Sequence, residues 1–493
     1  MLVVSTFLCK QPAQITATKS GELCHLRSNG VTPAPVRSTT YKGSSKVNIQ
    51  TVQFAHILEN RDLEALHDFL SHTAFVISHK SESIETILRV LWYIPVNSTI
   101  IIVTNCLEEE RSELASTLKA RLADHRKIYL IHQKDERIAA LFQACNVSQI
   151  LGQDGKVRSG KGEGMYIGAL CAHLLGDPRW LIFYDADNFV PSALLEYTLA
   201  MCRLFTTAPY PTHACEYHSP IVRRRARQQG APDLHNIRIC WSSKPDMGKV
   251  NLETRILGRT TRVVSPLIES LLEGWFGVQN HPISSSNAGE QGMTVKTAAS
   301  LRFSSGFSVE TLQLIDLLFN ATKWKKNPRE VIFQQYLSQS PHFHEKKDDE
   351  HIKKMIEESL GSFWHYEAAL PTNVKGHLQR VYDELELERV LPAVYPPLQT
   401  LPLKRFATLM QQYALGIPAD YIHPAIRERS TEKHVAINVH AIEAHTQEHM
   451  AMNVNTQEHL AVNINAQDML LADAPYQELL VAEPNYRDSL LAD

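Results

Sequence analysis

Short apolar runs alternate with amphipathic stretches from Val47 onward, and this alternation is the main structural signal in the chain. Four runs have the length and β-branched content of buried strands, and the segments between them carry apolar residues at helical spacing. The four runs are "TAFVIS", "STIIIVT", "KIYLIH" and "RWLIFYD". Strands that alternate with helices form a largely parallel sheet, so the pattern predicts an α/β fold built on such a sheet.

Polar residues follow each predicted strand directly, in the segments "SHKSE", "TNC", "HQKD" and "DADN". The carboxyl ends of parallel strands lie at one edge of a sheet, and ligands of open α/β sheets bind outside that edge. The sequence therefore predicts that these polar exits together form the functional site.

Composition divides the chain into three parts. Residues 1–46 are rich in Ser, Thr and Pro, and we expect a poorly ordered extension there. The alternating pattern occupies 47–432, with a first part to about residue 200 and a second part beyond it. In 433–493, "TQEHMAMNVN" is followed by "TQEHLAVNIN", and two copies are too few to predict a solenoid. We expect this tail to carry no catalysis.

The overall balance of residues is that of a globular protein, with 44% hydrophobic and 21% charged residues. A formal charge of −3 provides no field that would gather nucleic acid or an anionic membrane. The 8 cysteines never form a C-x-x-C pair, which favours a reducing compartment. We expect a cytoplasmic protein without nucleic-acid or membrane partners; organelle import and a homodimer stay open.

Asp185 and Asp187 end the fourth predicted strand, and residues two apart in an extended chain project to the same side. Both carboxylates can then face one hard divalent cation such as Mg²⁺ or Mn²⁺, which binds phosphate oxygens as well. The alternative is that these aspartates only cap the helix that follows.

The segment "SGKGEGM" at 159–165 lies between the third and fourth strands, just before a predicted helix. Its glycines would let backbone amides approach an anion, and Lys161 would add a positive charge. The segment has neither the P-loop spacing nor that of the dinucleotide fingerprint. A tight surface turn with a solvated lysine is the alternative.

Two further segments carry residues suited to ligand binding. His342 and His344 are two apart in a polar segment, and one imidazole could complete a metal site held by carboxylates. Arg259 and Arg262 follow a glycine and stand beside hydroxyl side chains, a combination that suits a carboxylate or a phosphate. A structural histidine pair and a solvated arginine face are the alternatives.

Together these segments resemble the mannosyl-3-phosphoglycerate synthase family, whose members are retaining glycosyltransferases of the A-type fold. The resemblance runs from about residue 47 to about residue 380. It rests on the ordered segments "IIIVTN", "IHQKD", "DGKVRSGKGEGMYIGAL", "YDADNFVPSALLEY", "GRTTRVVSPL", "NAGEQGMT", "SSGFSVE" and "PHFHEKKDDEH".

The resemblance implies a Rossmann-like, mostly parallel sheet with helical C-terminal additions. It also implies transfer of mannose from GDP-mannose to the 2-hydroxyl of 3-phosphoglycerate, with release of GDP and a divalent metal cofactor. Catalysis would fall to Asp185, Asp187 and Lys161. One histidine of the pair His342 and His344 would complete the metal site.

The resemblance also suggests which residues hold the two substrates. The residues expected on the nucleotide sugar are Glu82, Asn105, Lys161, Glu163 and Asp185. The "GRT" segment matches the acceptor segment of the related glucosyl-3-phosphoglycerate synthases. Its residues expected on phosphoglycerate are Gly258, Arg259 and Thr261.

Several alternatives to this function stay open. The chain could use another nucleotide sugar, as glucosyl-3-phosphoglycerate synthase does, or it could be a non-catalytic scaffold. A sugar-nucleotide pyrophosphorylase would carry a glycine-rich loop after the first strand, where this chain has "FVISHKSE". A phosphatase of the haloacid-dehalogenase type would have Thr or Val where this chain has Phe189, so that alternative is discounted. Two mechanisms of transfer are open as well. In one, Glu310 attacks the sugar as a nucleophile; in the other, the leaving phosphate removes the proton of the acceptor hydroxyl.

Overall fold

The computed structural model describes residues of the first of two compact units, Met1–Arg429 and Ser430–Asp493. The described residues are 2–5, 38–41, 47–53, 63–80, 82–122, 127–188, 190–206, 234–242, 258–279, 281–342 and 348–413. The repeat-containing tail predicted for 433–493 lies outside them, and the domain boundaries stay predictions.

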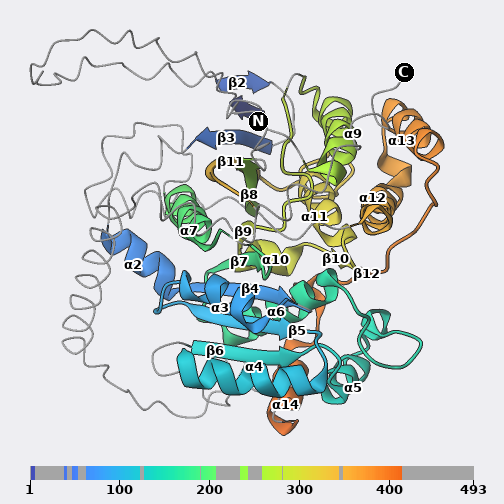
Figure 1. Cartoon of the computed structure of the whole chain (residues 1–493). Coiled ribbons are helices and arrows are strands. Elements are labelled where there is room, and N and C mark those ends of the chain that lie inside the picture. Colours follow the sequence, from blue (N-terminus) through green and yellow to red (C-terminus); the bar gives the residue numbers. More distant parts are fainter. Residues whose placement is uncertain are drawn as a thin grey trace, which may run out of the picture. The chain divides into compact units, whose positions relative to one another are not determined.

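One sheet of ten strands forms the centre of the first unit, in the order β2-β1-β3-β11-β8-β9-β7-β4-β5-β6, which can be followed down Figure 1. All of these strands except β2 and β9 run in one direction, so the predicted mostly parallel sheet is confirmed. The strands are β1 (Leu2–Ser5), β2 (Ser38–Tyr41), β3 (Val47–Gln53), β4 (Thr73–His79), β5 (Thr99–Thr104), β6 (Lys127–His132), β7 (Trp180–Asp185), β8 (Leu234–Ser242), β9 (Gln291–Thr294) and β11 (Val331–Pro341).

Two strands lie within the N-terminal stretch 1–46. They are β1 and β2, and β1 pairs in parallel with β3, so backbone hydrogen bonding joins residues 2–5 to the sheet. The other residues of the stretch lie outside the described ones, so the poorly ordered extension stays a prediction.

The four strands predicted from the apolar runs are confirmed as β4, β5, β6 and β7. β4 is covered on both faces: Ala74 and Val76 belong to one hydrophobic cluster, and Phe75 and Ile77 to the other. The chain adds β5 and β6 on one side of β4, then places β7 on the other side. This reversal of strand order creates the place where open α/β sheets bind ligands.

Helices cover the two faces of the sheet. Apolar residues of α2, α3, α4 and α7 share one hydrophobic cluster, whereas those of α5, α6 and α9 to α14 share the other. The helices are α2 (Leu63–Ser71), α3 (Ile84–Trp92), α4 (Glu108–Arg121), α5 (Glu136–Ala144), α6 (Lys161–Leu175), α7 (Pro191–Thr206), α9 (Arg259–Phe276), α10 (Val295–Ser300), α11 (Ser308–Phe319), α12 (Asp349–Trp364), α13 (Thr372–Glu384) and α14 (Leu403–Gln412). The last three confirm the predicted helical C-terminal additions.

Helix α6 packs against β4 through small residues. A Cβ atom on Gly168 would overlap the side chain of Val76, and one on Gly164 would lie 3.0 Å from Ser78 Oγ. Because these positions lack side chains, the helix backbone comes close to the strand. This close packing fixes the position of the first residue of α6, Lys161.

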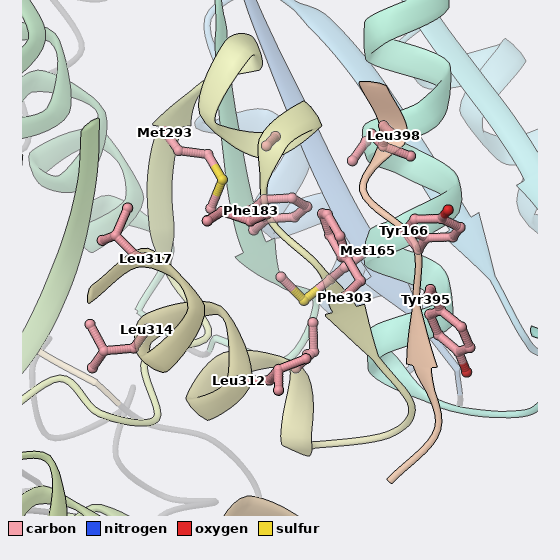
Figure 2. Close-up of a cluster of buried hydrophobic side chains, with 14 of the residues drawn as sticks. Met165, Tyr166, Phe183, Met293, Phe303, Leu312, Leu314, Leu317, Tyr395 and Leu398 are labelled. Atoms are coloured by element: carbon pink, nitrogen blue, oxygen red, sulfur yellow. The ribbon is translucent and has the colours of Figure 1, made fainter. Parts of the chain in front are cut away.

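Aromatic side chains anchor the same helix on its other side (Figure 2). The ring of Tyr166 lies 5.3 Å from that of Phe303 in β10 (Phe303–Ser304) and 5.4 Å from that of Tyr395 in β12 (Val394–Tyr395). β10 and β12 pair as a small antiparallel sheet. The cluster in Figure 2 also includes Leu312, so α6 and α11 are held over one apolar core.

We predict that Gly168→Ala lowers the free energy of unfolding by roughly 1–2 kcal/mol, because the overlap with Val76 outweighs the better helix propensity of alanine. Urea denaturation measures the change. The control is Gly376→Ala in α13, where the new Cβ would lie 3.8 Å from the nearest side-chain atom, on Arg380. The control should be neutral or slightly stabilising, and an equal loss in both variants would contradict the close packing of α6.

Candidate active site

The two aspartates lie where the strand order reverses, at the carboxyl end of β7. Asp185 is the last residue of β7 and is in register with Ser78 of β4, whereas Asp187 lies in the following turn. Asn188, not an aspartate, accepts the hydrogen bond of Val190 N, at 2.9 Å. This contact lies just before α7, whereas Asp185 pairs with Lys161.

Lys161 is held between two carboxylates from distant parts of the chain. Its Nζ forms an ion pair with Asp185 Oδ1 and a second, at 2.7 Å, with Glu310 Oε1 of α11. Burial acts to lower the pKa of Lys161, but Asp185 and Glu310 raise it above the ordinary value of a lysine. Lys161 is therefore a charged, enclosed group, and the alternative of a solvated surface lysine is wrong.

The glycines around Lys161 serve packing, which corrects the reason we gave for them. A Cβ atom on Gly162 would overlap the carbonyl of Ser304, and one on Gly160 would lie 3.0 Å from the backbone of Gly306. Gly162 N also donates to Gly306 O, at 3.0 Å. These glycines thus admit another segment of backbone, whereas we expected them to admit an anion.

Glu163 also contributes to this packing. It is fully buried; Tyr395 donates to its Oε1 at 2.6 Å, and Gly306 N donates to its Oε2 at 3.2 Å. One oxygen therefore holds the turn at Gly306, a residue with a φ of 61°, and the other holds Tyr395 of β12. These contacts describe a supporting residue, and the expected contact of Glu163 with the nucleotide sugar stays a prediction.

The segment "NAGEQGM" passes directly over the ion pair. A Cβ atom on Gly289 would overlap both Asp185 Oδ2 and Lys161 Nζ, so only glycine fits there without displacement. We noted this segment as a loop of small residues that lets a ligand come close to the backbone. In the structure, the group that comes close to the backbone is the ion pair itself.

Glu290 is a candidate site residue that the sequence did not single out. It is fully buried, and its Oε2 accepts a hydrogen bond from Trp241 Nε1 at 2.7 Å. Burial raises the pKa of Glu290, and the charges of Asp185 and Asp187 raise it further. The only signal in the sequence was an acidic residue among small ones, which is too common to predict a site.

His342 lies at the end of β11, next to Glu290. Its Nδ1 is 3.8 Å from Glu290 Oε1, an oxygen that makes no hydrogen bond to any described residue. The imidazole stacks on Trp241 with ring centroids 4.1 Å apart and planes 7° apart. The structure thus brings His342 to the carboxylates, while His344 lies outside the described residues.

The residues expected on the nucleoside lie in the loops after β4 and β5. Asn105 N donates to His79 O at 2.8 Å, and Glu82 Oε2 accepts from Lys80 N at 2.8 Å. His79 joins the loops, because its Nδ1 is bonded to Thr104 Oγ1 and its Nε2 to Glu82 O. Glu82 and Asn105 therefore share one edge of the sheet, as the strand order requires.

The residues expected on the acceptor begin helix α9. Gly258 is its N-cap, Arg259 its first residue, and Thr261 is buried in its first turn. Arg259 is 26% exposed and pairs with Asp349 at the start of α12, at 2.8 Å. An anion at this helix start would meet the backbone amides as well as the guanidinium.

Comparison with known proteins identifies the family. A family model described as mannosyl-3-phosphoglycerate synthase matches residues 36–410. The chain belongs to the mannosyl-3-phosphoglycerate synthase family. It is therefore a glycosyltransferase that uses a nucleotide sugar, and the predicted A-type fold agrees with its mostly parallel sheet.

Named relatives carry the same description. The mannosyl-3-phosphoglycerate synthase of Pyrococcus furiosus is 30% identical over 328 residues, which cover 64% of this chain and 77% of the relative. That of Aeropyrum pernix is 28% identical over 366 residues, covering 71% and 87%. The crystal structure of the Rubrobacter xylanophilus enzyme is 14% identical, with a TM-score of 0.37, and covers 69% of this chain and 83% of that one.

The acidic groups of this mannosyl-3-phosphoglycerate synthase family member fit a divalent cation in charge and in donor type. The charges of Asp185, Asp187 and Lys161 all act on the pKa of Glu290, and Lys161 forms an ion pair with Asp185. Carboxylate oxygens and the imidazole of His342 suit Mg²⁺ or Mn²⁺. In the described part of the chain, no three His, Cys, Asp or Glu side chains are already gathered around one point. Asp185 is turned toward Lys161 instead.

None of the described helices combines the length and apolar character needed to cross a membrane. The cytoplasmic location and the homodimer stay predictions.

We predict that Gly289→Ala lowers the rate of sugar transfer at least about 100-fold, because a methyl group would push Lys161 and Asp185 out of position. The rate is measured as release of nucleoside diphosphate from the nucleotide sugar, and thermal unfolding reports whether the fold survives. Gly376→Ala in α13 is the matched control and should keep full activity. An active Gly289→Ala variant would show that this ion pair is not needed for transfer.

Proposed function

We propose that the protein transfers mannose from GDP-mannose to the 2-hydroxyl of 3-phosphoglycerate, with retention of configuration and with Mg²⁺ or Mn²⁺. Family membership supports the substrate pair. The observation that carries the site is the enclosed ion pair of Lys161 and Asp185 at the reversal of strand order, beside the buried carboxylate of Glu290.

Lys161 is the residue of this chain best placed to stabilise the departing GDP. It is charged, enclosed and fixed at the first residue of α6, so it needs no reorganisation when negative charge grows on the diphosphate. Asp185, Asp187 and one histidine would hold the cation. When bound, this cation would neutralise the charge of the leaving group.

The acceptor would be held by the start of α9. Arg259 binds its carboxylate or phosphate, and the helix N-terminus adds backbone donors. The bond between the mannose C1 and the phosphate oxygen breaks while C1 bonds to the acceptor oxygen on the same face. The acceptor hydroxyl gives its proton to the departing phosphate oxygen, so no protein base is required.

We predict that Asp187→Ala lowers product formation at least about 100-fold without unfolding the protein, because a metal-binding carboxylate at the end of a strand is not part of the core. Purified protein is incubated with GDP-mannose, 3-phosphoglycerate and Mg²⁺ or Mn²⁺, and products are identified by mass. A chelator should stop the wild-type reaction, and added metal should restore it. Glu109→Gln, on the exposed face of α4, should leave it unchanged.

The same assay separates the alternatives. If product forms from UDP-glucose or GDP-glucose but not from GDP-mannose, the donor is that glucose nucleotide and the proposed donor is wrong. Absence of a phosphorylated glycoside with every donor and both metals would favour the scaffold. Full activity of Asp187→Ala would refute the metal assignment.

We predict that Arg259→Ala raises the KM for 3-phosphoglycerate roughly 10- to 100-fold and leaves the KM for GDP-mannose nearly unchanged, because a charged contact to the acceptor is lost. Arg259→Lys should recover only part of the loss, since lysine lacks the planar fork of arginine. Steady-state kinetics with each substrate varied in turn measures both constants. Arg380→Ala, on the exposed face of α13, is the control. A rise in the KM for GDP-mannose alone would show that Arg259 binds the donor and not the acceptor.

A further inference from the structure

Lys161 joins two carboxylates that differ in exposure. Asp185 is 21% exposed and Glu310 only 3%. Asp185 is thus the partner that an incoming ligand can reach, and Glu310 is the enclosed one. An enclosed carboxylate beside a lysine is poorly placed to attack a sugar, which weighs against Glu310 as a nucleophile.

Glu310 is fixed from the protein side. It lies in the first turn of α11, and its backbone carbonyl accepts a hydrogen bond from Arg238 Nη2 at 2.6 Å. Arg238 is fully buried, and its Nη1 donates to the carbonyls of Ser285 and Ser286, at 3.1 and 3.0 Å. One arginine therefore ties the backbone at the start of α11 to the segment that leads to Gly289 and Glu290, so the position from which Glu310 reaches Lys161 is fixed.

We propose that Glu310 is a positioning residue that balances the charge of Lys161, so that Asp185 can give an oxygen to a divalent cation while Lys161 stays beside it. This inference rests on the proposed function, which makes Asp185 a metal ligand. Glu310 itself contacts neither the cation nor the substrates.

The physical basis is competition for Asp185. Lys161 and a cation both attract the same carboxylate, and a buried lysine that loses its only partner is strongly destabilised. With Glu310 present, Lys161 keeps one anionic partner when Asp185 turns to the cation. Without that charge, the ion pair with Asp185 is the one that Lys161 still makes among the described residues, and the cation must break it.

The test measures Mn²⁺ affinity of the full chain directly, without substrates. Glu310→Gln keeps the shape of the side chain and removes its charge. We expect it to weaken Mn²⁺ binding roughly tenfold, measured as free Mn²⁺ by electron paramagnetic resonance during titration. Glu310→Asp should recover part of the affinity. Glu384→Gln, on the exposed face of α13, controls for the loss of one negative charge far from the site.

Repeating the measurement in a Lys161→Met variant tests whether Glu310 acts through Lys161 or only attracts the cation by its charge. If Glu310 acts through Lys161, then Glu310→Gln should change Mn²⁺ affinity by less than about twofold in a Lys161→Met variant. If Glu310 only attracts the cation from a distance, the loss should be as large in that background as in the wild type. Thermal unfolding of each variant confirms that the fold is retained.

Three results would overturn the inference. The first is an unchanged Mn²⁺ affinity in Glu310→Gln. The second is an equal loss of Mn²⁺ affinity in the wild-type and Lys161→Met backgrounds. In both cases the proposed function stands. A wild-type protein that binds no Mn²⁺ would remove the metal assignment of the proposed function, and the role of Glu310 with it.

Discussion

The site depends on one enclosed ammonium group, Lys161 Nζ, and on the two carboxylates that bind it, Asp185 and Glu310. Burying charged groups is unfavourable unless they are paired with good geometry. The three residues come from three elements, α6, β7 and α11, so the ion pairs form only if these elements lie in one arrangement. The same pairs keep Lys161 charged, because the two carboxylates outweigh the effect of burial on its pKa.

Glycine residues make that arrangement possible, because they let backbone segments come close together. Gly164 and Gly168 bring α6 close to β4, and Gly289 lets a backbone segment pass over the ion pair. The aromatic rings of Tyr166, Phe303 and Tyr395 then pack α6 against β10 and β12 (Figure 2). Interiors of this density tolerate little added volume, so the positions of the charged groups follow from the shape of the apolar core beneath them.

The charge distribution connects this architecture with sugar transfer. Glu290 and Asp187 add negative charge beside the pair, and burial and neighbouring carboxylates both raise the pKa of Glu290. An acidic site of this kind gains from a cation, and a cation bound there can in turn hold a diphosphate. Trp241 contacts both Glu290 and His342, so one aromatic side chain orients two groups of the site. The geometry of the site does not specify the substrate class. Family membership does, because the family uses a nucleotide sugar.

Local pattern was enough to predict the strands β4 to β7, the place of Asp185 at a strand end and that of Lys161 before a helix, because strand period and residue type are properties of short segments. The chemistry of Glu163 could not be read in the same way: its partner Tyr395 is 232 residues away, and only packing shows that the carboxylate points inward. Glu310 lies 149 residues from Lys161, and Glu290 stands among small residues without a local motif. The sequence by itself thus determined the sheet and its polar edge. Tertiary structure decided which charges meet there, since contacts between distant segments depend on how the core packs.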